Sequence, residues 1–105
     1  MTDVITTPKI SFVVADDTMR EQPYRVIVEN DDVTSMDFVI MVLTSIFGLG
    51  IDEAVNVMLT AHAHGEAVVT VLPYQEASDK VYAAHESART NGFPLRFYLE
   101  PEGSP

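Results

Sequence analysis

Cysteine is absent from the 105-residue chain, and Lys and Arg are scarce. Without cysteine the chain has no disulfide framework, no thiolate zinc site and no cysteine nucleophile. Six Lys and Arg stand against 16 Asp and Glu, which gives a formal net charge of −10. Because phosphate binding needs clustered Lys and Arg, we expect no nucleic-acid partner. The charge suits a cationic partner or peptide, or solubility alone.

A long hydrophobic run is also missing. The longest uncharged run, residues 38–51, has 14 residues and is too short to span a bilayer. No basic segment precedes an apolar run at the N-terminus, so we expect no signal peptide, no membrane association and a cytoplasmic location. Hydrophobic residues still make up 47% of the chain, which is enough for one modest core in a single domain.

The hydrophobic pattern predicts alternating strands and helices after residue 23. Three strands are predicted, at 24–29, where the segment is β-branched, at 66–72, and at 95–99 after Pro94. Apolar residues at helical spacing predict three helices: one from Met36 to about Gly48, one over 52–64 and one over 75–91. The first helix carries a wide apolar stripe that begins at Met36, so most of its surface should be covered.

The order of these elements is β-α-α-β-α-β. Three strands among three helices indicate an α+β fold, with the helices packed against a three-stranded antiparallel sheet. We expect a flexible N-terminal extension over 1–23, a core over 24–100 and a loose tail over 101–105.

The segment Asn30–Met36 joins the first strand to the first helix. Two carboxylates and a carboxamide stand side by side there, with no basic residue between them. Thr34 or Ser35 can cap the helix, because a hydroxyl at the N-cap accepts a hydrogen bond from a free backbone N–H. By itself the segment is typical of a turn rich in turn-forming residues.

The three histidines are the first candidates for chemistry. His62 and His64 diverge by about 200° on a helix, which disfavours a shared metal ion. His62 lies on the apolar side of its helix, where a half-buried histidine bonded to backbone is the common case. His85 looks like a surface or edge residue.

Enzyme sites find no positive support in the sequence. A metal site built from Asn30, Asp31, Asp32 and His62 is conceivable, but it lacks the ligand spacing of a calcium loop. Ser35 and His62 come without a nucleophile-elbow motif, and there is no Gly-rich phosphate loop.

A binding site remains, in which the acidic turn forms a rim around an apolar hole. Such a hole would accept a group that is cationic at one end and apolar at the other. The N-terminal residue of a polypeptide is such a group, because its α-amino group has a pKa near 8 and is mostly charged at neutral pH.

Two segments resemble the ClpS family. Residues 24–39 (YRVIVENDDVTSMDFV) resemble its signature, approximately N-D-D-x-T-P-M-E-F-V after a hydrophobic strand. Residues 58–67 (MLTAHAHGEA) resemble its M-L-x-V-H-x-x-G-x-A segment. Lys80-Val81 and residues 91–95 (NGFPL) also follow the family's later pattern, so the resemblance runs in order over residues 24–100.

ClpS proteins are adaptors rather than enzymes. The resemblance implies that this protein recognises substrates with a bulky hydrophobic N-terminal residue: Phe, Tyr, Trp or Leu. It also implies delivery to a ClpA-type AAA+ unfoldase that works with the ClpP protease, without a cofactor. We expect a monomer, since nothing in the sequence demands an oligomer. The family fold has three helices and a three-stranded antiparallel sheet, as does the fold expected from the hydrophobic pattern.

The family's roles carry over by position onto three sets of residues. The resemblance implies that the α-amino group is held, directly or through water, by Asn30, Asp31 and His62. The neighbouring loop positions that touch the peptide backbone match Asp32 and Thr34. The walls of the side-chain pocket match Val39, Met58, Ala61 and Leu95, and Met36 matches a gate that excludes β-branched side chains.

Two further matches concern delivery. Lys80 matches a position on the unfoldase-binding face, and the extension over 1–23 matches the segment needed for delivery rather than for binding.

The chain departs from the family pattern at three positions. Ser35 replaces the usual Pro, and Gln75 replaces an acidic residue on the unfoldase-facing side. Ala61 stands where many members have Val, which should deepen the pocket and favour Phe, Trp and Tyr over Leu.

Two alternatives stay open at this point. One is another protein-interaction module, with a fold like that of the ribosomal stalk protein's C-terminal domain and no amino-acid pocket. The joint presence of Asn30, Asp31, Met36 and His62 favours the adaptor over it. The other is a small metal-dependent hydrolase, for which stoichiometric metal in the purified protein would be the decisive observation.

Overall fold

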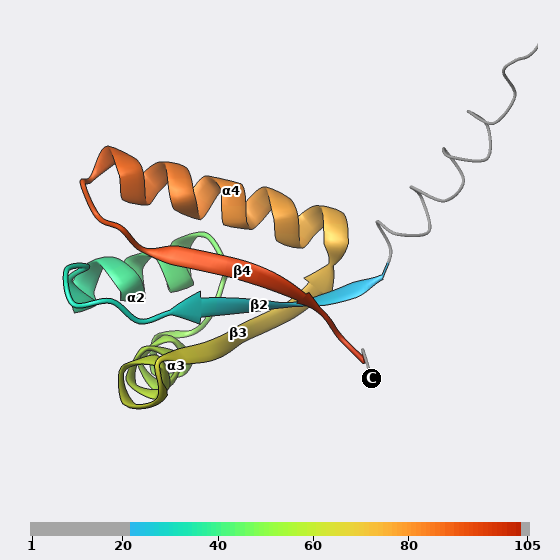
Figure 1. Ribbon diagram of the computed structural model, residues 1–105, viewed down its shortest axis with the longest axis horizontal. Helices are drawn as coiled ribbons and strands as arrows, with labels where there is room; N and C mark the ends of the chain where they lie inside the picture. The colour runs from blue at the N-terminus through green and yellow to red at the C-terminus, as the bar shows by residue number, and fades with distance from the viewer. Residues whose placement is uncertain (1–21, 104–105) are drawn as a thin grey trace, which may run out of the picture.

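A sheet and three helices make up the part of the chain that the computed structural model describes, residues 22–103 (Figure 1). The elements follow in the order β2 (Pro23–Glu29), α2 (Met36–Ser45), α3 (Ile51–His64), β3 (Glu66–Pro73), α4 (Tyr74–Thr90) and β4 (Arg96–Pro101). The predicted α+β class and the order β-α-α-β-α-β are confirmed.

β2 is the central strand of the sheet. The strand order is β3-β2-β4, and β2 pairs antiparallel with both neighbours. Strand alternation directs Val26 and Val28 into the hydrophobic core, where they are 0% and 2% exposed. The register shifts between Val26 and Ile27, so Val69 of β3 has no direct partner and forms a bulge there.

Three prolines close the sheet at one end. Pro23 lies opposite Pro73, and Tyr24 lies opposite Pro101. Because proline has no backbone N–H, it cannot extend the ladder of hydrogen bonds. The strands therefore stop together at this end, and the loops that carry the acidic turn lie at the opposite end of β2.

The helices cover the sheet through small and branched side chains. α4 packs against all three strands, and its buried residues are all alanines, which allow a close approach. α3 packs against β3, and α2 packs against α3. Leu43 and Val42 of α2 are fully buried and complete the core with Val26 and Val28.

The element bounds differ from the expectations by a few residues. α2 ends at Ser45, so Ile46 to Gly50 form a connection rather than a last helical turn. Pro23, expected in the N-terminal extension, begins β2, and Pro101, expected in the tail, ends β4. The rest of the extension, residues 1–21, and residues 104–105 of the tail lie outside the described residues.

His85 differs from the expectation of a plain surface or edge residue. Its side chain is half-buried, and Nε2 accepts a hydrogen bond of 3.0 Å from the backbone N–H of Phe97 in β4. Burial lowers the pKa of His85, and the positive charge of Arg96 lowers it further. His85 therefore joins α4 to the outer edge of β4 in its neutral form, since an acceptor nitrogen cannot carry a proton.

Candidate functional site

The site begins where β2 ends. The backbone N–H of Asn30 donates to the carbonyl oxygen of Gly65 at 2.9 Å, which ties the end of β2 to the end of α3. Gly65 caps α3 in the left-handed conformation, with φ of 95°, and its own N–H donates to the carbonyl of Ala61. Asn30 is thereby held opposite the last turn of α3, which carries Ala61 and His62.

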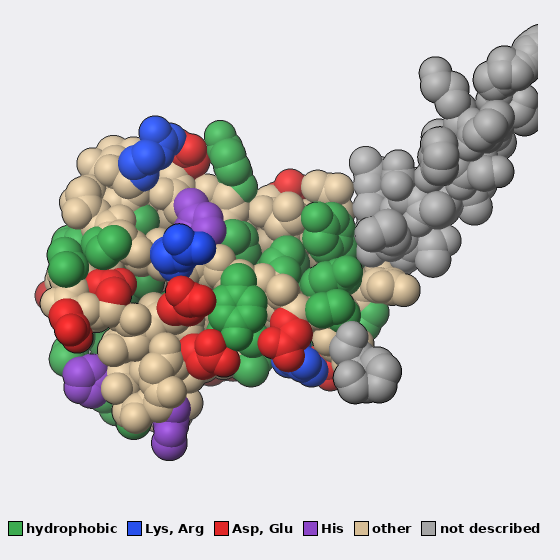
Figure 2. All heavy atoms as spheres, in the orientation of Figure 1, with side chains coloured by type: hydrophobic (Ala, Val, Ile, Leu, Met, Phe, Trp, Pro, Cys, Tyr) green, Lys and Arg blue, Asp and Glu red, His purple; other side chains and the backbone are tan. Residues whose placement is uncertain are grey.

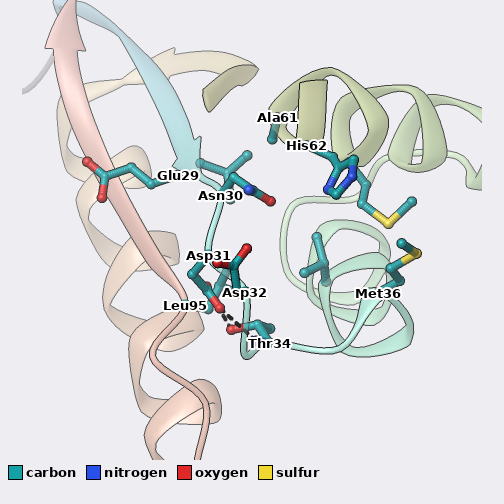
Figure 3. A pocket seen from close by; sticks show the side chains of 12 residues that line it. Glu29, Asn30, Asp31, Asp32, Thr34, Met36, Ala61, His62 and Leu95 are labelled. Carbon is teal, nitrogen blue, oxygen red and sulfur yellow. Dashed lines mark hydrogen bonds between the residues drawn. The ribbon is translucent and has the colours of Figure 1, made fainter. Parts of the chain in front are cut away.

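Asp31 organises the turn that follows. Its Oδ1 accepts hydrogen bonds from the backbone N–H groups of Val33, at 2.8 Å, and Thr34, at 2.6 Å. Its Oδ2 accepts from the Thr34 hydroxyl at 2.8 Å (Figure 3). Partial burial raises the pKa of the Asp31 carboxyl, but these hydrogen bonds lower it more, so the net pKa lies below its usual value. Asp31 is therefore ionised at neutral pH.

Ser35 connects the turn to α2. It has extended backbone angles, and its hydroxyl accepts a hydrogen bond from the N–H of Phe38 at 3.2 Å. Of the two expected candidates for the N-cap, Ser35 takes that role, while Thr34 is bonded to Asp31. Met36, the first residue of α2, is placed beside the turn as a result.

A cavity opens between this turn, α2, α3 and the segment that precedes β4 (Figure 3). All ten residues that the sequence analysis assigned to binding line it: Asn30, Asp31, Asp32, Thr34, Met36, Val39, Met58, Ala61, His62 and Leu95. The structure thus brings together residues that lie up to 65 positions apart in the chain, from Asn30 to Leu95.

Two lining residues were missed by the sequence analysis. Val28 is 2% exposed and forms part of the apolar floor. Glu29 lines the cavity too, but Figure 3 shows its carboxylate pointing away, toward β4. There it lies 3.8 Å from Nε of Arg96. The alternation of β2 was the available signal, because it directs Val28 to the same face as the core residue Val26.

The cavity has room for one side chain and is apolar on one side. Ala61 and Leu95 are 5% and 4% exposed and form its walls with Val28. The cavity holds about 190 Å³. An engineered apolar cavity of about 150 Å³ in another protein binds benzene, so this volume suffices for one aromatic ring.

The rim of the cavity is acidic and polar. Asp31 and Asp32 stand on one side, and the labelled side chains of Asn30 and His62 point toward each other across the opening (Figure 3). None of the lining residues is Lys or Arg. Within residues 22–103, no Lys or Arg forms an ion pair with Asp31 or Asp32. A ligand with a positive charge at this rim meets no competing cation from these residues.

Lys80, the residue expected on the unfoldase-binding face, lies outside the cavity. Its Nζ donates to the carbonyl oxygen of Ile46 at 3.1 Å, just beyond the end of α2. A cation at a helix C-terminus is stabilised by the helix dipole, so Lys80 also serves the fold.

Residues 22–103 hold neither a cluster of metal ligands nor a membrane-spanning helix. No group of three or more His, Cys, Asp or Glu side chains in this part of the chain is arranged to hold a metal ion. Over the same residues, no helix is long and apolar enough to cross a membrane.

Comparison with known proteins identifies the family. A family model described as "ATP-dependent Clp protease adaptor protein ClpS" matches residues 19–98. The chain belongs to the ClpS family. The resemblance seen in the acidic turn and in the last turn of α3 is therefore confirmed, and the match extends over residues 19–98.

ClpS proteins from several bacteria are similar over most of their length. A ClpS of Wolinella succinogenes is 46% identical over 77 residues, which cover 73% of this chain and 76% of that protein. Clp protease adapter protein ClpS 2 of Mesorhizobium japonicum is 38% identical over 102 residues, or 97% and 99% of the two chains. ClpS 1 of Bradyrhizobium diazoefficiens is 39% identical over 104 residues, again 97% and 99%.

A solved structure shares both the fold and the sequence. Agrobacterium tumefaciens ClpS2, determined in complex with L-phenylalaninamide, is 41% identical and superposes with a TM-score of 0.74. The match covers 79% of this chain and all of that one. L-phenylalaninamide is an amino-acid amide with a free α-amino group and a benzyl side chain.

Proposed function

We propose that this ClpS-family protein binds the free N-terminus of polypeptides that begin with Phe, Tyr, Trp or Leu. It delivers them to a ClpA-type AAA+ unfoldase for degradation by ClpP. In this role it is a cytoplasmic monomer that catalyses nothing and needs no cofactor. The observation that carries the proposal is one cavity with an acidic rim, free of Lys and Arg, around an apolar hole the size of one side chain.

The apolar hole accounts for the hydrophobic part of the ligand. Burying a Phe side chain of about 150–200 Å² contributes about 4–5 kcal/mol before ordering costs are subtracted. Leu95, Ala61 and Val28 provide the surface for it, and all are buried already in the free protein. The hole therefore needs little rearrangement to accept a ring.

The rim accounts for the charged part. A free α-amino group is an ammonium at neutral pH, and each charge-assisted hydrogen bond to it is worth about 1.5–3 kcal/mol. Asp31 keeps its negative charge because its pKa is lowered, while Asn30 and His62 offer further polar atoms nearby. The L-phenylalaninamide bound to the Agrobacterium relative combines the same two chemical groups, which supports the proposal.

Met36 accounts for the selection of side-chain shape. It lies at the mouth of the cavity, at the start of α2. Val and Ile carry two heavy substituents on Cβ, and these would meet Met36 as the side chain enters. Phe, Tyr, Trp and Leu have a single heavy substituent on Cβ and would enter the cavity without this clash with Met36.

The delivery step rests on Lys80 and on the N-terminal extension over 1–23. A Lys80→Ala variant should keep its affinity for a Phe-initiated peptide and deliver a Phe-initiated reporter to ClpAP more slowly. The melting temperature must be followed in parallel, since Lys80 also bonds the carbonyl of Ile46. Unchanged delivery by a folded variant would remove Lys80 from the unfoldase contact.

The binding proposal is tested with three labelled peptides followed by fluorescence anisotropy. One starts with Phe, the second is its N-acetylated twin and the third starts with Val. We expect only the free Phe peptide to bind, because acetylation removes the charge and Val collides with Met36. Equal binding of all three, or of none, would favour the stalk-type interaction module instead.

A further inference from the structure

The mouth of the cavity carries two thioethers, Met36 and Met58. Met36 is the more accessible, with 55% of its surface exposed, whereas Met58 is partly buried. Figure 3 shows the labelled Met36 on the helix side of the opening. A third methionine, Met41 on α2, is 40% exposed but does not line the cavity. Residues 22–103 therefore offer one exposed thioether at the site, Met36, and a comparably exposed one away from it, Met41.

We propose that Met36 is an oxidation site through which hydroperoxides switch the pocket off. The inference rests on the proposed function, because it concerns the regulation of the same pocket. It requires two properties in one side chain: access for the oxidant in the free protein, and contact with the ligand in the complex. Met36 is accessible to the oxidant because 55% of its surface is exposed, and it can contact the ligand because it lines the cavity.

The reaction is a two-electron oxygen transfer. The Sδ lone pair attacks the terminal oxygen of a hydroperoxide, an S–O bond forms and the O–O bond breaks. The proton of that oxygen moves to the leaving oxygen, so the products are methionine sulfoxide and an alcohol, or water from hydrogen peroxide. The sulfur is oxidised and the hydroperoxide is reduced, and the sulfoxide is returned to the thioether by methionine sulfoxide reductases.

The sulfoxide changes the chemistry of the mouth. A flexible apolar side chain becomes a polar one with a strong acceptor oxygen. A bound Phe side chain would cover that oxygen and offers it no hydrogen-bond donor. Covering an unsatisfied polar group is unfavourable, so the oxidised protein should bind a Phe-initiated peptide about tenfold more weakly, or about 1.4 kcal/mol.

Protection by the ligand gives the same inference a second observable. A bound peptide that contacts Met36 covers its Sδ atom and blocks the approach of the oxidant. A Phe-initiated peptide should therefore slow oxidation of Met36 and leave the rate at Met41 unchanged within the same molecules.

The experiment uses the full chain and dilute hydrogen peroxide. Peptide mapping by mass spectrometry follows the sulfoxide fraction at Met36, Met41 and Met58, with and without the Phe-initiated peptide. Anisotropy measures the affinity before treatment, after it, and after methionine sulfoxide reductase. We expect selective protection of Met36, about tenfold weaker binding when Met36 is oxidised, and recovery after reduction.

Three variants locate the effect. Met41→Leu should lose affinity on oxidation as the wild type does. Met36→Leu should keep most of its own starting affinity after the same treatment. Met58→Leu has its own untreated affinity, because Met58 lines the cavity, and oxidation should weaken that affinity by the same factor as in the wild type.

Each failure has a distinct meaning. If the untreated protein does not bind the Phe peptide, the proposed function fails. If the untreated protein binds and the protein fully oxidised at Met36 binds equally well, the switch is wrong. Equal loss of affinity in wild type and Met36→Leu would also overturn it, as would loss without recovery after complete reduction of Met36.

Discussion

Two groups of carboxylates, one at each end of the sheet, have different partners. At the proline end, Arg25 of β2 forms ion pairs with Glu100 at 2.5 Å and with Glu102 at 3.0 Å. Figure 2 shows a basic side chain next to acidic ones toward the lower right of the described surface. At the other end, Asp31 has no such cationic partner among residues 22–103 and is held by three hydrogen bonds from its own turn.

The difference separates two uses of a carboxylate. Glu100 and Glu102 share the single positive charge of Arg25, so each of them already has a cationic partner within the chain. Hydrogen bonds from neutral N–H and O–H groups fix Asp31 in place and lower its pKa, but they leave a net negative charge. The proline end therefore only closes the sheet, whereas the pocket end keeps a charge ready for a cation.

The largest effect is expected from removing the charge at the pocket end. Asp31→Asn keeps a carbonyl oxygen for the N–H groups of Val33 and Thr34, so most of the turn should persist. It removes the negative charge that faces the ammonium. Binding of a Phe-initiated peptide should weaken by about 10- to 100-fold, from the loss of a charge-assisted interaction of about 1.5–3 kcal/mol. Fluorescence anisotropy measures this.

Glu100→Gln is the matched control, because it removes one carboxylate charge at the proline end. Its affinity for the same peptide should equal that of the wild type. Equal weakening by Asp31→Asn and Glu100→Gln would mean that only net charge matters, and the distinction between the two ends would be wrong.

A smaller effect is expected from the pocket wall. Ala61 is buried, and Ala61→Val adds two carbons to the hole. The smaller hole should suit Leu better and an aromatic ring less well, which shifts the Leu/Phe affinity ratio by up to about tenfold. Competition of Leu- and Phe-initiated peptides against one labelled probe gives the ratio. A ratio that stays constant would show that Ala61 does not set this preference.

The stability of the folded protein, measured as its melting temperature, should depend on pH through His85. Burial and Arg96 depress its pKa in the folded state, so folding favours the neutral ring. The stabilisation is complete above the unfolded value of 6.5 and is lost as the pH falls through the folded pKa. His85→Gln keeps an acceptor for the N–H of Phe97 without titrating. Between pH 7 and pH 5 the melting temperature of the wild type should fall further than that of this variant. If the two melting temperatures fall by the same amount, His85 is not the source of the pH dependence.

The smallest effect is expected at the proline end. Arg25→Gln removes both ion pairs with Glu100 and Glu102. Exposed ion pairs contribute little to stability, and none of these residues lines the cavity. Peptide affinity should be unchanged, and the melting temperature should fall only slightly. A clear loss of peptide affinity would show that the two ends are coupled through β2.

The fold was predictable because its patterns are local. The β-branched run of β2 and the helical stripe of α2 depend on neighbours in the sequence, and so does the left-handed cap at Gly65. The ends of elements were less predictable, because tertiary contacts decide them. Nothing near Lys80 in the sequence shows that its Nζ reaches the carbonyl of Ile46, and nothing near His85 shows that it accepts from Phe97.

The site was predictable mainly through the family resemblance. The residues alone led to an acidic rim around an apolar hole, but they could not bring Leu95 to Asn30, because that proximity depends on the whole topology. The exposure of Met36 also depends on the topology and could not be predicted from the local sequence. It fits the apolar stripe of α2, which predicts burial, yet it is 55% exposed because it stands at the mouth of the cavity.

A structure of the protein with L-phenylalaninamide tests the central claim most directly. The account predicts the benzyl group in the hole between Ala61, Met36 and Leu95, with the ammonium against Asn30 and Asp31. A ligand bound at another place, or one bound in this cavity with its amine turned to solvent, would contradict the account.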